Sequence, residues 1–548
     1  MPVINLFYNR LSKILGQPLS KQSILDNLPY LGLDIEEETD DYVKVEYNPN
    51  RPDFSSEWGI ARALKGFLEF ETGLPQYSIE DSNIVLKVDK SIMEFRPFFV
   101  GAVVKGVNFD DESIKQIMVM QDDLDNGIGR RRSKVSTGIH NLDAVEPPFE
   151  YKAVPPDFRF NPLGYNTEKS MKQILQDVET GRNYGHIVKN FSGYPLITDS
   201  NGKVLSFPPI INGEVTRVST ETQNLFIDIT STNMKSAEDV LAVLLTALAD
   251  MGGKLESIEV QYPNFKKITP DLTALRMIIE SSFINRLLGM NLSIKEIIKY
   301  LNRSRLDAKL SNNSIEVYIP RYRSDIIHPI DIVEEVLLGY NVANLTPTIP
   351  ESAYVGSLSS RLIALDSARE VLIGLGLIEV MHYSLISRET IVRTSGKEPE
   401  EHLKVENPKT GEHEYLRYSL IPSLLSTLSK NIHEEYPQRI FEVSTVFNRN
   451  KENPNNIKET TVASVAIAHT KANYTEAKSY CESFLSQYKA IPFSTKAADQ
   501  SIYIPGRSAE FEQNGMRIGK IGEIAPSILE SFSLRVPVSA FEVNLKSI

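Results

Sequence analysis

The stretch RSDIIHPIDIVEEVLLGYN, residues 323–341, gathers carboxylates at the start of an apolar helical pattern. The acids are Asp325, Asp331, Glu334 and Glu335. Pro329 favours a helix that starts beside His328, because the first helical turn does not need the missing N–H of proline. Asp331 then shares one helix face with the acids three and four positions later. The helix dipole explains the first acid but not the later two. We therefore favour a hard-cation site, for Mg²⁺, or a surface for an Arg- and Lys-rich partner over a solvated face.

A second set of polar residues lies in STETQNLFIDITSTN, residues 219–233. Strand alternation places Leu225, Ile227 and Ile229 on one face. The opposite face carries Asn224, Phe226, Asp228 and Thr230. A carboxylate and a hydroxyl thus share one strand face, and Ser206 ends a nearby strand-like run. The pattern suits either a polar pocket or an ordinary half-exposed strand, and the position of Asp228 between two isoleucines keeps the pocket hypothesis open.

The usual motifs for nucleotide and metal chemistry are missing. There is no G-x-x-x-x-G-K-[ST] loop, and IGLGLIEV lacks the third glycine of a dinucleotide-binding motif and follows a helix pattern. The eight histidines contain no H-x-x-x-H pair, which disfavours a zinc enzyme. The single cysteine, Cys481, excludes an intramolecular disulfide, and its helical apolar spacing predicts a core position.

Length and charge restrict the class of protein further. A chain of 548 residues is expected to form three to five domains. No apolar run reaches the ~20 residues of a membrane helix, and the N-terminus resembles no secretory signal, so we expect a cytoplasmic protein. The net charge of −12 argues against a surface that binds nucleic acid everywhere. The best local basic patch is Arg130-Arg131-Arg132-Ser133-Lys134, for which a solvated loop is the alternative.

An internal repeat links residues 15–68 with residues 288–340. Each copy runs from Leu-Gly through a helix that opens at Leu-Ser, a short strand and an Arg-x-Asp turn to a closing helix. Aligned at that turn, Asp53 corresponds to Asp325. The acids Asp331, Glu334 and Glu335 correspond to Gly59, Arg62 and Ala63. The module can therefore be built without the three helix acids, which supports a special role for them.

The other regions have mixed patterns. Residues 80–266 combine strand alternation and proline-rich turns with a closing helix over 236–253, which indicates an α+β domain. Residues 344–352 are typical of a linker, and residues 353–548 alternate helices with strands.

Six segments together resemble one family, the β subunits of phenylalanyl-tRNA synthetase of the archaeal and eukaryotic-cytosolic type. They are NPNRPDFSSEWGIAR, GRRRSKVSTGIHNLD, YPLITDSNGKVLSFPPIING, RSDIIHPIDIVEEVLLGYN, LRYSLIPSLL and YIPGRSAEF…IGKIGEIAP, in order along the whole chain. The resemblance implies an α+β multidomain fold. Its parts would be an N-terminal winged-helix-like module over 1–78, an editing domain over 79–266, a second module with the acidic cluster over 267–345, and a class II synthetase-like antiparallel-sheet domain over 346–548.

The resemblance also implies a division of labour. The class II-like domain would be catalytically silent, since nothing after Ile521 matches the G-x-G-x-x-R motif and QRIFEVSTVF, residues 438–447, is similar to a degenerate ATP-binding motif. Aminoacylation would reside in an α subunit that binds ATP and phenylalanine within an (αβ)₂ heterotetramer, with tRNA(Phe) as substrate. A class II-like interface left without its partner should be apolar, so we expect the isolated chain to aggregate.

Two sites follow from the resemblance. The acids Asp325, Asp331, Glu334 and Glu335 would bind a Mg²⁺ shared with the α subunit. The editing domain would hydrolyse tyrosine wrongly attached to tRNA(Phe), with Asp228 contacting the tyrosine or the water, Thr230 and Ser206 lining the pocket, and Leu196 contacting the ring. The family's His-Asp-Leu-Asp motif reads His140-Asn141-Leu142-Asp143 here, which puts the role of Asn141 in doubt. Two rival hypotheses are a purely structural assembly subunit and a nucleic-acid-binding regulator built from the repeated modules.

Overall fold

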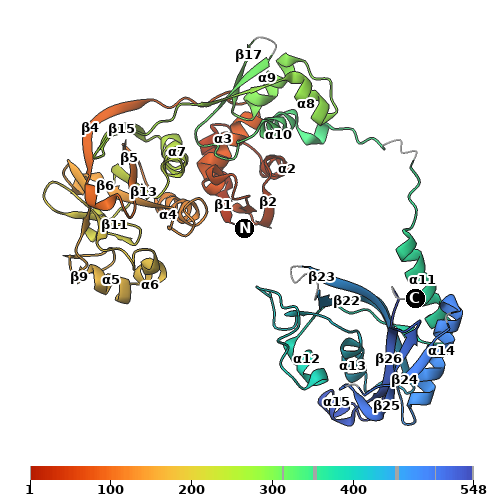
Figure 1. The fold of residues 1–548 in the computed structure, drawn as a ribbon. Helices are drawn as coiled ribbons and strands as arrows, with labels where there is room; N and C mark the ends of the chain where they lie inside the picture. The colour runs from red at the N-terminus through yellow and green to blue at the C-terminus, as the bar shows by residue number, and fades with distance from the viewer. Residues whose placement is uncertain are drawn as a thin grey trace. The chain divides into compact units, whose positions relative to one another are not determined.

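A computed structural model describes residues 2–311, 314–349, 354–450, 456–490, 492–499 and 501–545. The chain forms two compact units, Met1–Thr348 and Ile349–Ile548 (Figure 1). Of the linker expected over 344–352, residues 350–352 lie outside the described residues. No helix in the described ranges is long and apolar enough to cross a membrane. The finer division of the first unit at residues 78 and 266 stays a prediction.

The sequence repeat corresponds to a repeated order of elements. The first copy consists of β1 (Val3–Phe7), α1 (Tyr8–Leu15), α2 (Lys21–Asn27), β2 (Asp34–Glu38), β3 (Tyr42–Glu46) and α3 (Glu57–Phe67). The second consists of β16 (Leu275–Ile279), α8 (Ser281–Leu288), α9 (Ile294–Arg303), β17 (Asp307–Ser311), β18 (Ser314–Ile319) and α10 (Pro329–Tyr340). The last strand lies in the middle of both sheets, β1-β3-β2 and β16-β18-β17. Ser20 and Ser293 cap α2 and α9, as the Leu-Ser openings predict.

A large sheet lies between the two copies in the chain. Its order is β12 (Ile211–Asn212), β11 (Val204–Phe207), β10 (Tyr194–Thr198), β7 (Phe149–Val154), β4 (Ile79–Val88), β14 (Lys254–Gln261), β5 (Phe98–Lys105), β13 (Asn224–Ser231) and β6 (Val135–Asn141). A further strand, β15 (Lys266–Thr269), pairs with β14. Short elements complete this region: β8 (Arg159–Phe160), β9 (Lys169–Ser170), α5 (Met171–Asp177) and α6 (Glu179–Tyr184).

Strand β13 is buried on both faces. Leu225, Ile227 and Ile229 pack in one core cluster with residues of α4 (Asp111–Asn126) and α7 (Met234–Asp250). Phe226 packs in a second cluster with Phe99 and other side chains of neighbouring strands. The predicted alternation is therefore present, but the expectation of a half-exposed strand is wrong, because β5 and β6 flank β13 and apolar layers cover both faces.

The second unit is built on a sheet with the order β19 (Ile378–Glu379), β22 (Gln438–Arg449), β23 (Ile457–Ala468), β27 (Val538–Asn544), β26 (Met516–Ile524), β25 (Tyr503–Gln513) and β24 (Ser494–Ala497). These strands pair antiparallel, except that β19 runs parallel to β22. A separate two-stranded sheet pairs β20 (Leu385–Ile386) antiparallel with β21 (Tyr415–Leu416). The helices are α11 (Ser360–Gly374), α12 (Arg388–Ser395), α13 (Ile421–Lys430), α14 (Tyr474–Lys489) and α15 (Pro526–Ser531) (Figure 1). Cys481 on α14 is fully buried, as its spacing predicts.

Candidate functional site

A cavity of about 410 Å³ lies beside the large sheet, among α4, β6 and the β11–β12 corner. Its apolar lining includes Phe109, Ile117, Ile139 and Ile210. Polar and charged side chains interrupt that lining: Gln121, Asp122, Arg132, Ser136, Thr137, Thr180, Ser206, Asn212, Thr216 and Arg217. A mostly apolar cavity of this size with a few polar groups is typical of a small-molecule site.

A chain of buried polar groups leads from this cavity to Asp228. The Nδ1 atom of His140 lies 2.8 Å from the Thr216 hydroxyl, and its Nε2 atom lies 2.5 Å from Oδ2 of Asp228. All three residues are at most 1% exposed. In the imidazole tautomer that donates from Nε2 to the Asp228 carboxylate, Nδ1 can accept a hydrogen bond from the Thr216 hydroxyl, which also lies 3.2 Å from the carbonyl oxygen of Gly213 and 3.4 Å from that of Leu205. Thr216 is therefore the member of this hydrogen-bonded series that reaches the cavity.

Gly138 makes room for the Asp228–His140 contact. It faces Asp228 in the pairing of β6 with β13. A Cβ atom at this position would lie 2.2 Å from Oδ2 of Asp228 and 2.7 Å from Nε2 of His140. The absence of a side chain at Gly138 is therefore a condition for the contact.

The structure does not bring the four expected pocket residues together. Of these, only Ser206 lines the cavity. Leu196 is fully buried in the core cluster that includes Phe207, and its contact with a ligand ring stays a prediction. Thr230 is also fully buried, does not line the cavity, and its hydroxyl accepts a hydrogen bond from Nε of Arg96 at 2.8 Å.

Sequence reasoning missed Thr216, Gly138 and Arg96. The contact of His140 with Asp228 could not be inferred from the sequence, because the pairing of β6 with β13 joins residues 88 positions apart. The available signal was the polar side chain of Asp228 inside the apolar strand run LFIDI.

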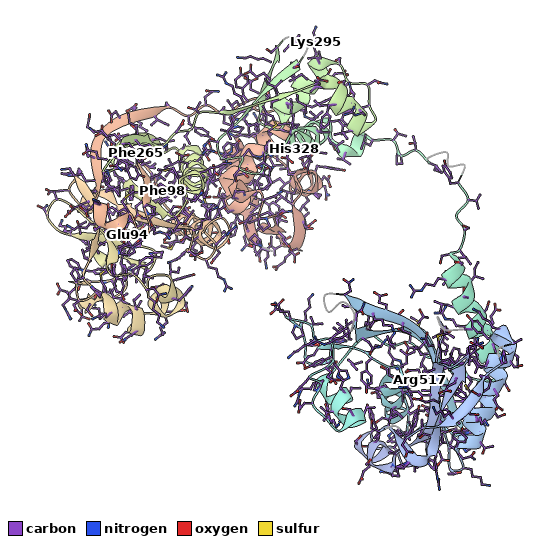
Figure 2. The ribbon with its side chains drawn as sticks, viewed as in Figure 1. Glu94, Phe98, Phe265, Lys295, His328 and Arg517 are labelled. Atoms are coloured by element: carbon purple, nitrogen blue, oxygen red, sulfur yellow. The ribbon has the colours of Figure 1, made fainter. Side chains whose placement is uncertain are left out.

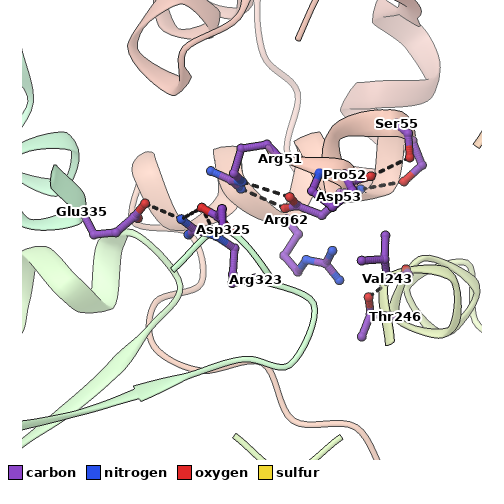
Figure 3. A network of polar contacts seen from close by, with 12 residues as sticks. Arg51, Pro52, Asp53, Ser55, Arg62, Val243, Thr246, Arg323, Asp325 and Glu335 are labelled. Atoms are coloured by element: carbon purple, nitrogen blue, oxygen red, sulfur yellow. Dashed lines mark hydrogen bonds and ion pairs between the residues drawn. The ribbon is translucent and has the colours of Figure 1, made fainter. Parts of the chain in front are cut away.

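The predicted acidic cluster is organised by a buried arginine. Arg323 is 3% exposed and binds Asp325 through Nε and Nη2 at 2.9 and 2.7 Å. The same Nη2 donates to Glu335 (Figure 3). Burial alone would raise the pKa of Asp325, but the Arg323 guanidinium outweighs it and lowers that pKa.

The first copy of the repeat contains the same pair. Arg51 binds Asp53 through Nε and Nη2 at 2.9 and 2.8 Å. Figure 3 shows this pair next to Asp325, whose pKa the Arg51 charge also lowers. The aligned Arg-x-Asp turns are therefore structural in both copies.

The two remaining acids have different environments. Asp331 caps α10, since its Oδ2 accepts the backbone N–H groups of Ile327 and His328 at 2.8 and 2.7 Å; His328 is labelled in Figure 2. Glu334 is exposed and makes no hydrogen bond or ion pair with another described residue. Partial burial and then the charges of Glu335, Asp331 and Asp325 raise the pKa of Glu334. Negative charge therefore remains uncompensated around Glu334.

These acids suit a metal site completed by a partner subunit better than a site formed by this chain alone. Within the described ranges, no group of three or more His, Cys, Asp or Glu side chains could hold a metal ion. Mg²⁺ often binds through only one or two carboxylates and takes its other ligands from water or a partner. The magnesium site expected at Asp325, Asp331, Glu334 and Glu335 therefore stays a prediction.

Two family models match the chain. The model described as "tRNA synthetase B5 domain" matches residues 277–341, and the model described as "Phenylalanyl tRNA synthetase beta chain CLM domain" matches residues 345–545. The first range contains the second copy of the repeat, and the second covers most of the C-terminal unit. Both models describe parts of aminoacyl-tRNA synthetases, which gives the class of protein.

Full-length relatives identify the family within that class. The chain is 39% identical over 550 residues to the phenylalanine–tRNA ligase β subunit of Archaeoglobus fulgidus, covering 100% of this chain and 98% of the relative. It is 38% identical over 554 residues to the subunit of the same name from Methanosarcina acetivorans, with 100% and 99% coverage. The crystal structure of an N-terminal fragment of the Pyrococcus horikoshii phenylalanyl-tRNA synthetase β subunit matches with a TM-score of 0.60 and 38% identity, over 62% of this chain and 99% of that chain. The chain thus belongs to the family of phenylalanine–tRNA ligase β subunits.

Proposed function

We propose that this chain supports the ATP-dependent attachment of phenylalanine to tRNA(Phe) by an α subunit, and that it hydrolyses tyrosine wrongly attached to that tRNA. The observation that carries the second part is the buried Thr216–His140–Asp228 chain, which ends at a cavity of small-molecule size. A purely structural subunit would not need a buried carboxylate, imidazole and hydroxyl in series.

A separate hydrolytic site has a physical reason. A synthetic pocket for an apolar ring rejects an analogue with one added hydroxyl only weakly, by ~10² in a comparable case. A second site can instead bind that hydroxyl. Ser206 and Asn212, both in the cavity lining, are the candidates for this contact.

The geometry suggests how the ester is cleaved. A water molecule attacks the ester carbonyl carbon, and its proton passes to Thr216 while the Thr216 proton passes to Nδ1 of His140. The bond from the acyl carbon to the ribose oxygen then breaks, and that oxygen takes up the proton. Asp228 holds the imidazole in the tautomer that accepts at Nδ1, so it is a positioning residue.

Aminoacylation is assigned to the α partner, within an (αβ)₂ heterotetramer. In the C-terminal unit, the strand with the degenerate motif uses its acid internally. Glu442 on β22 accepts from Nη1 of Arg417 at 2.7 Å and lies 2.6 Å from Nδ1 of His382. Arg417 is 1% exposed. A carboxylate and a guanidinium paired in this way are not available to ATP.

Mg²⁺ is the proposed cofactor of the acidic cluster. Glu334 would hold it directly, and Asp331 and Glu335 would add negative charge around it. The ion, when bound, would supply a positive charge shared with the partner subunit.

The deciding experiment is the hydrolysis of preformed tyrosyl-tRNA(Phe) by the chain co-expressed with its α partner, with Asp228→Ala as the comparison. We expect hydrolysis by the wild type and its loss in the variant, with aminoacylation intact. If the wild type does not exceed the uncatalysed rate, the chain is a structural assembly subunit.

A further inference from the structure

The basic run noted in the sequence forms an unusual turn between α4 and β6. Arg130, Arg131 and Arg132 have φ angles of +49°, +52° and +62°. Three consecutive non-glycine residues in the left-handed region are energetically unfavourable, so other contacts must hold the turn in place.

Buried groups fix this turn on several sides. Arg96 is 1% exposed and donates from Nη1 to the carbonyl oxygen of Ser133 at 3.2 Å, while its Nε donates to Thr230 on β13. The carbonyl oxygen of Lys134 accepts the Ser231 hydroxyl at 2.8 Å. The turn is therefore tied to the same strand that carries Asp228.

Arg132 joins the turn to the cavity. It lines the cavity and donates from Nη1 to the carbonyl oxygen of Ile210 at 3.2 Å. Its guanidinium also lies 4.4 Å from the centre of the Tyr184 ring and 3.3 Å from the buried Asp125 carboxylate. These contacts fix Arg132 at the cavity, and Arg130 and Arg131 precede it in the same turn.

Arg130 and Arg131 face solvent. Both are exposed, and neither side chain forms a hydrogen bond or ion pair with another described residue. In a chain with a net charge of −12, a rigid pair of free guanidinium groups is a local exception. Guanidinium groups match phosphate geometry, and a fixed backbone lowers the entropy lost on binding.

We propose that Arg130 and Arg131 bind the phosphodiester backbone of the single-stranded RNA segment whose 3′ end enters the cavity. This inference rests on the proposed hydrolytic function, because that function requires an RNA 3′ end at the cavity. The turn supplies position and charge, and Arg132 marks the boundary between the phosphate contacts and the cavity.

The test is the salt dependence of RNA binding by the full chain in complex with its α partner. The probe is an acceptor-stem RNA minihelix that carries tyrosine through an amide bond, so that binding is measured without hydrolysis. Each phosphate contact to a single strand contributes about 0.7 to the slope of log K against log salt. Arg130→Gly/Arg131→Gly should lower the slope by about 1.4 and weaken binding by roughly 10- to 30-fold at about 0.1 M salt.

The glycine variant should fold like the wild type, because glycine tolerates positive φ angles better than arginine. A loss of binding is then not caused by misfolding. Arg130→Lys/Arg131→Lys keeps both charges and should retain the slope. Arg276→Ala/Arg286→Ala changes the net charge by the same amount on another sheet and helix, and it should leave the slope unchanged.

The proposal is overturned if the glycine variant keeps the wild-type slope, or if the Arg276/Arg286 control lowers it equally. Hydrolysis of ester-linked tyrosyl-tRNA(Phe) is measured on the same samples. Wild-type hydrolysis with an unchanged slope in the glycine variant rejects the RNA contact alone, whereas absent wild-type hydrolysis rejects the proposed function.

Discussion

The carboxylate of Asp228 lies 2.5 Å from the imidazole of His140, between neighbouring strands of the large sheet and out of contact with solvent. A buried carboxylate needs hydrogen-bond donors, and the imidazole provides one. The second imidazole nitrogen then points to Thr216 and the cavity. This pair therefore connects the sheet interior to the site where we place hydrolysis.

Replacing Asp228 by Asn should separate orientation from binding. The amide can donate to Nε2 and so favours the opposite imidazole tautomer, in which Nδ1 no longer accepts a proton. We expect deacylation kcat to fall by about 10²- to 10⁴-fold, with KM and aminoacylation nearly unchanged. Asp143→Asn, an acid that binds Asn224 outside the chain of contacts, is the matched control. Equal activity of Asp228→Asn and wild type would contradict the role of the pair.

Gly138→Ala tests the space that the pair requires. The added methyl group would meet both Asp228 and His140 at less than 3 Å. We expect a loss of about 1–3 kcal/mol of unfolding free energy and of deacylation together, measured by urea denaturation of the complex and by tyrosyl-tRNA hydrolysis. Gly185→Ala is the control, because its added methyl group would find its nearest neighbour at 3.4 Å, an ordinary contact. A Gly138→Ala protein with wild-type stability and hydrolysis would show that the contact is dispensable.

The sequence predicted the elements better than it predicted their contacts. The alternation of β13, the capped helix at Pro329 and the repeated module were all recoverable, because each depends on spacing along a short segment. The surroundings of Leu196 and Thr230, which lie outside the cavity lining, could not be predicted because strand alternation assigns a face but not what covers it. Here Phe207 packs with Leu196, and Arg96 binds Thr230. The acids were recognised as a cluster, but Arg323, only two residues before Asp325, was not recognised as their partner.

Arg323→Met should be strongly destabilising and should change the response to acid. It leaves the largely buried Asp325 and Glu335 without the guanidinium that binds both, at a cost of about 3–5 kcal/mol.

In the wild type the pKa of Asp325 is lowered. The stabilising contribution of Asp325 is therefore complete above its unfolded pKa of about 3.9 and is lost as the pH falls through the folded pKa. Without Arg323, the effect of burial on that pKa is opposed mainly by the Arg51 charge, so the stabilising contribution should shrink. The measurement is the unfolding free energy of the wild type and of Arg323→Met between about pH 3 and 6. Arg276→Met, which removes an exposed pair with Glu316, should cost at most about 1 kcal/mol.

Glu334→Gln should raise stability and abolish the response to Mg²⁺. The pKa of Glu334 is raised, so the ionised side chain opposes folding and stability is lost as the pH rises through the folded pKa. Neutralising it should therefore raise the Tm at pH 7, with no added metal. Bound Mg²⁺ should stabilise the wild-type complex by offsetting the same charge, and this increase in Tm should be absent in the variant. Glu316→Gln serves as the control acid in the same module. A variant that is still stabilised by Mg²⁺ to the wild-type extent would place the ion elsewhere.

The C-terminal unit should self-associate when it has no partner. Several large apolar side chains of this unit are exposed, among them Ile373 at 54%, Ile378 at 67%, Met381 at 87% and Tyr383 at 78%. Neighbouring exposed apolar groups of this kind mark a protein interface. We expect the chain expressed alone to form soluble aggregates at micromolar concentration and the chain co-expressed with the α subunit to be monodisperse, as measured by light scattering after gel filtration. Ile378→Asp/Met381→Lys should reduce aggregation of the isolated chain and weaken its association with α, because exposed apolar side chains promote both. A monodisperse wild-type monomer would contradict this interpretation, and reduced aggregation with undiminished α binding would place the subunit interface on another face.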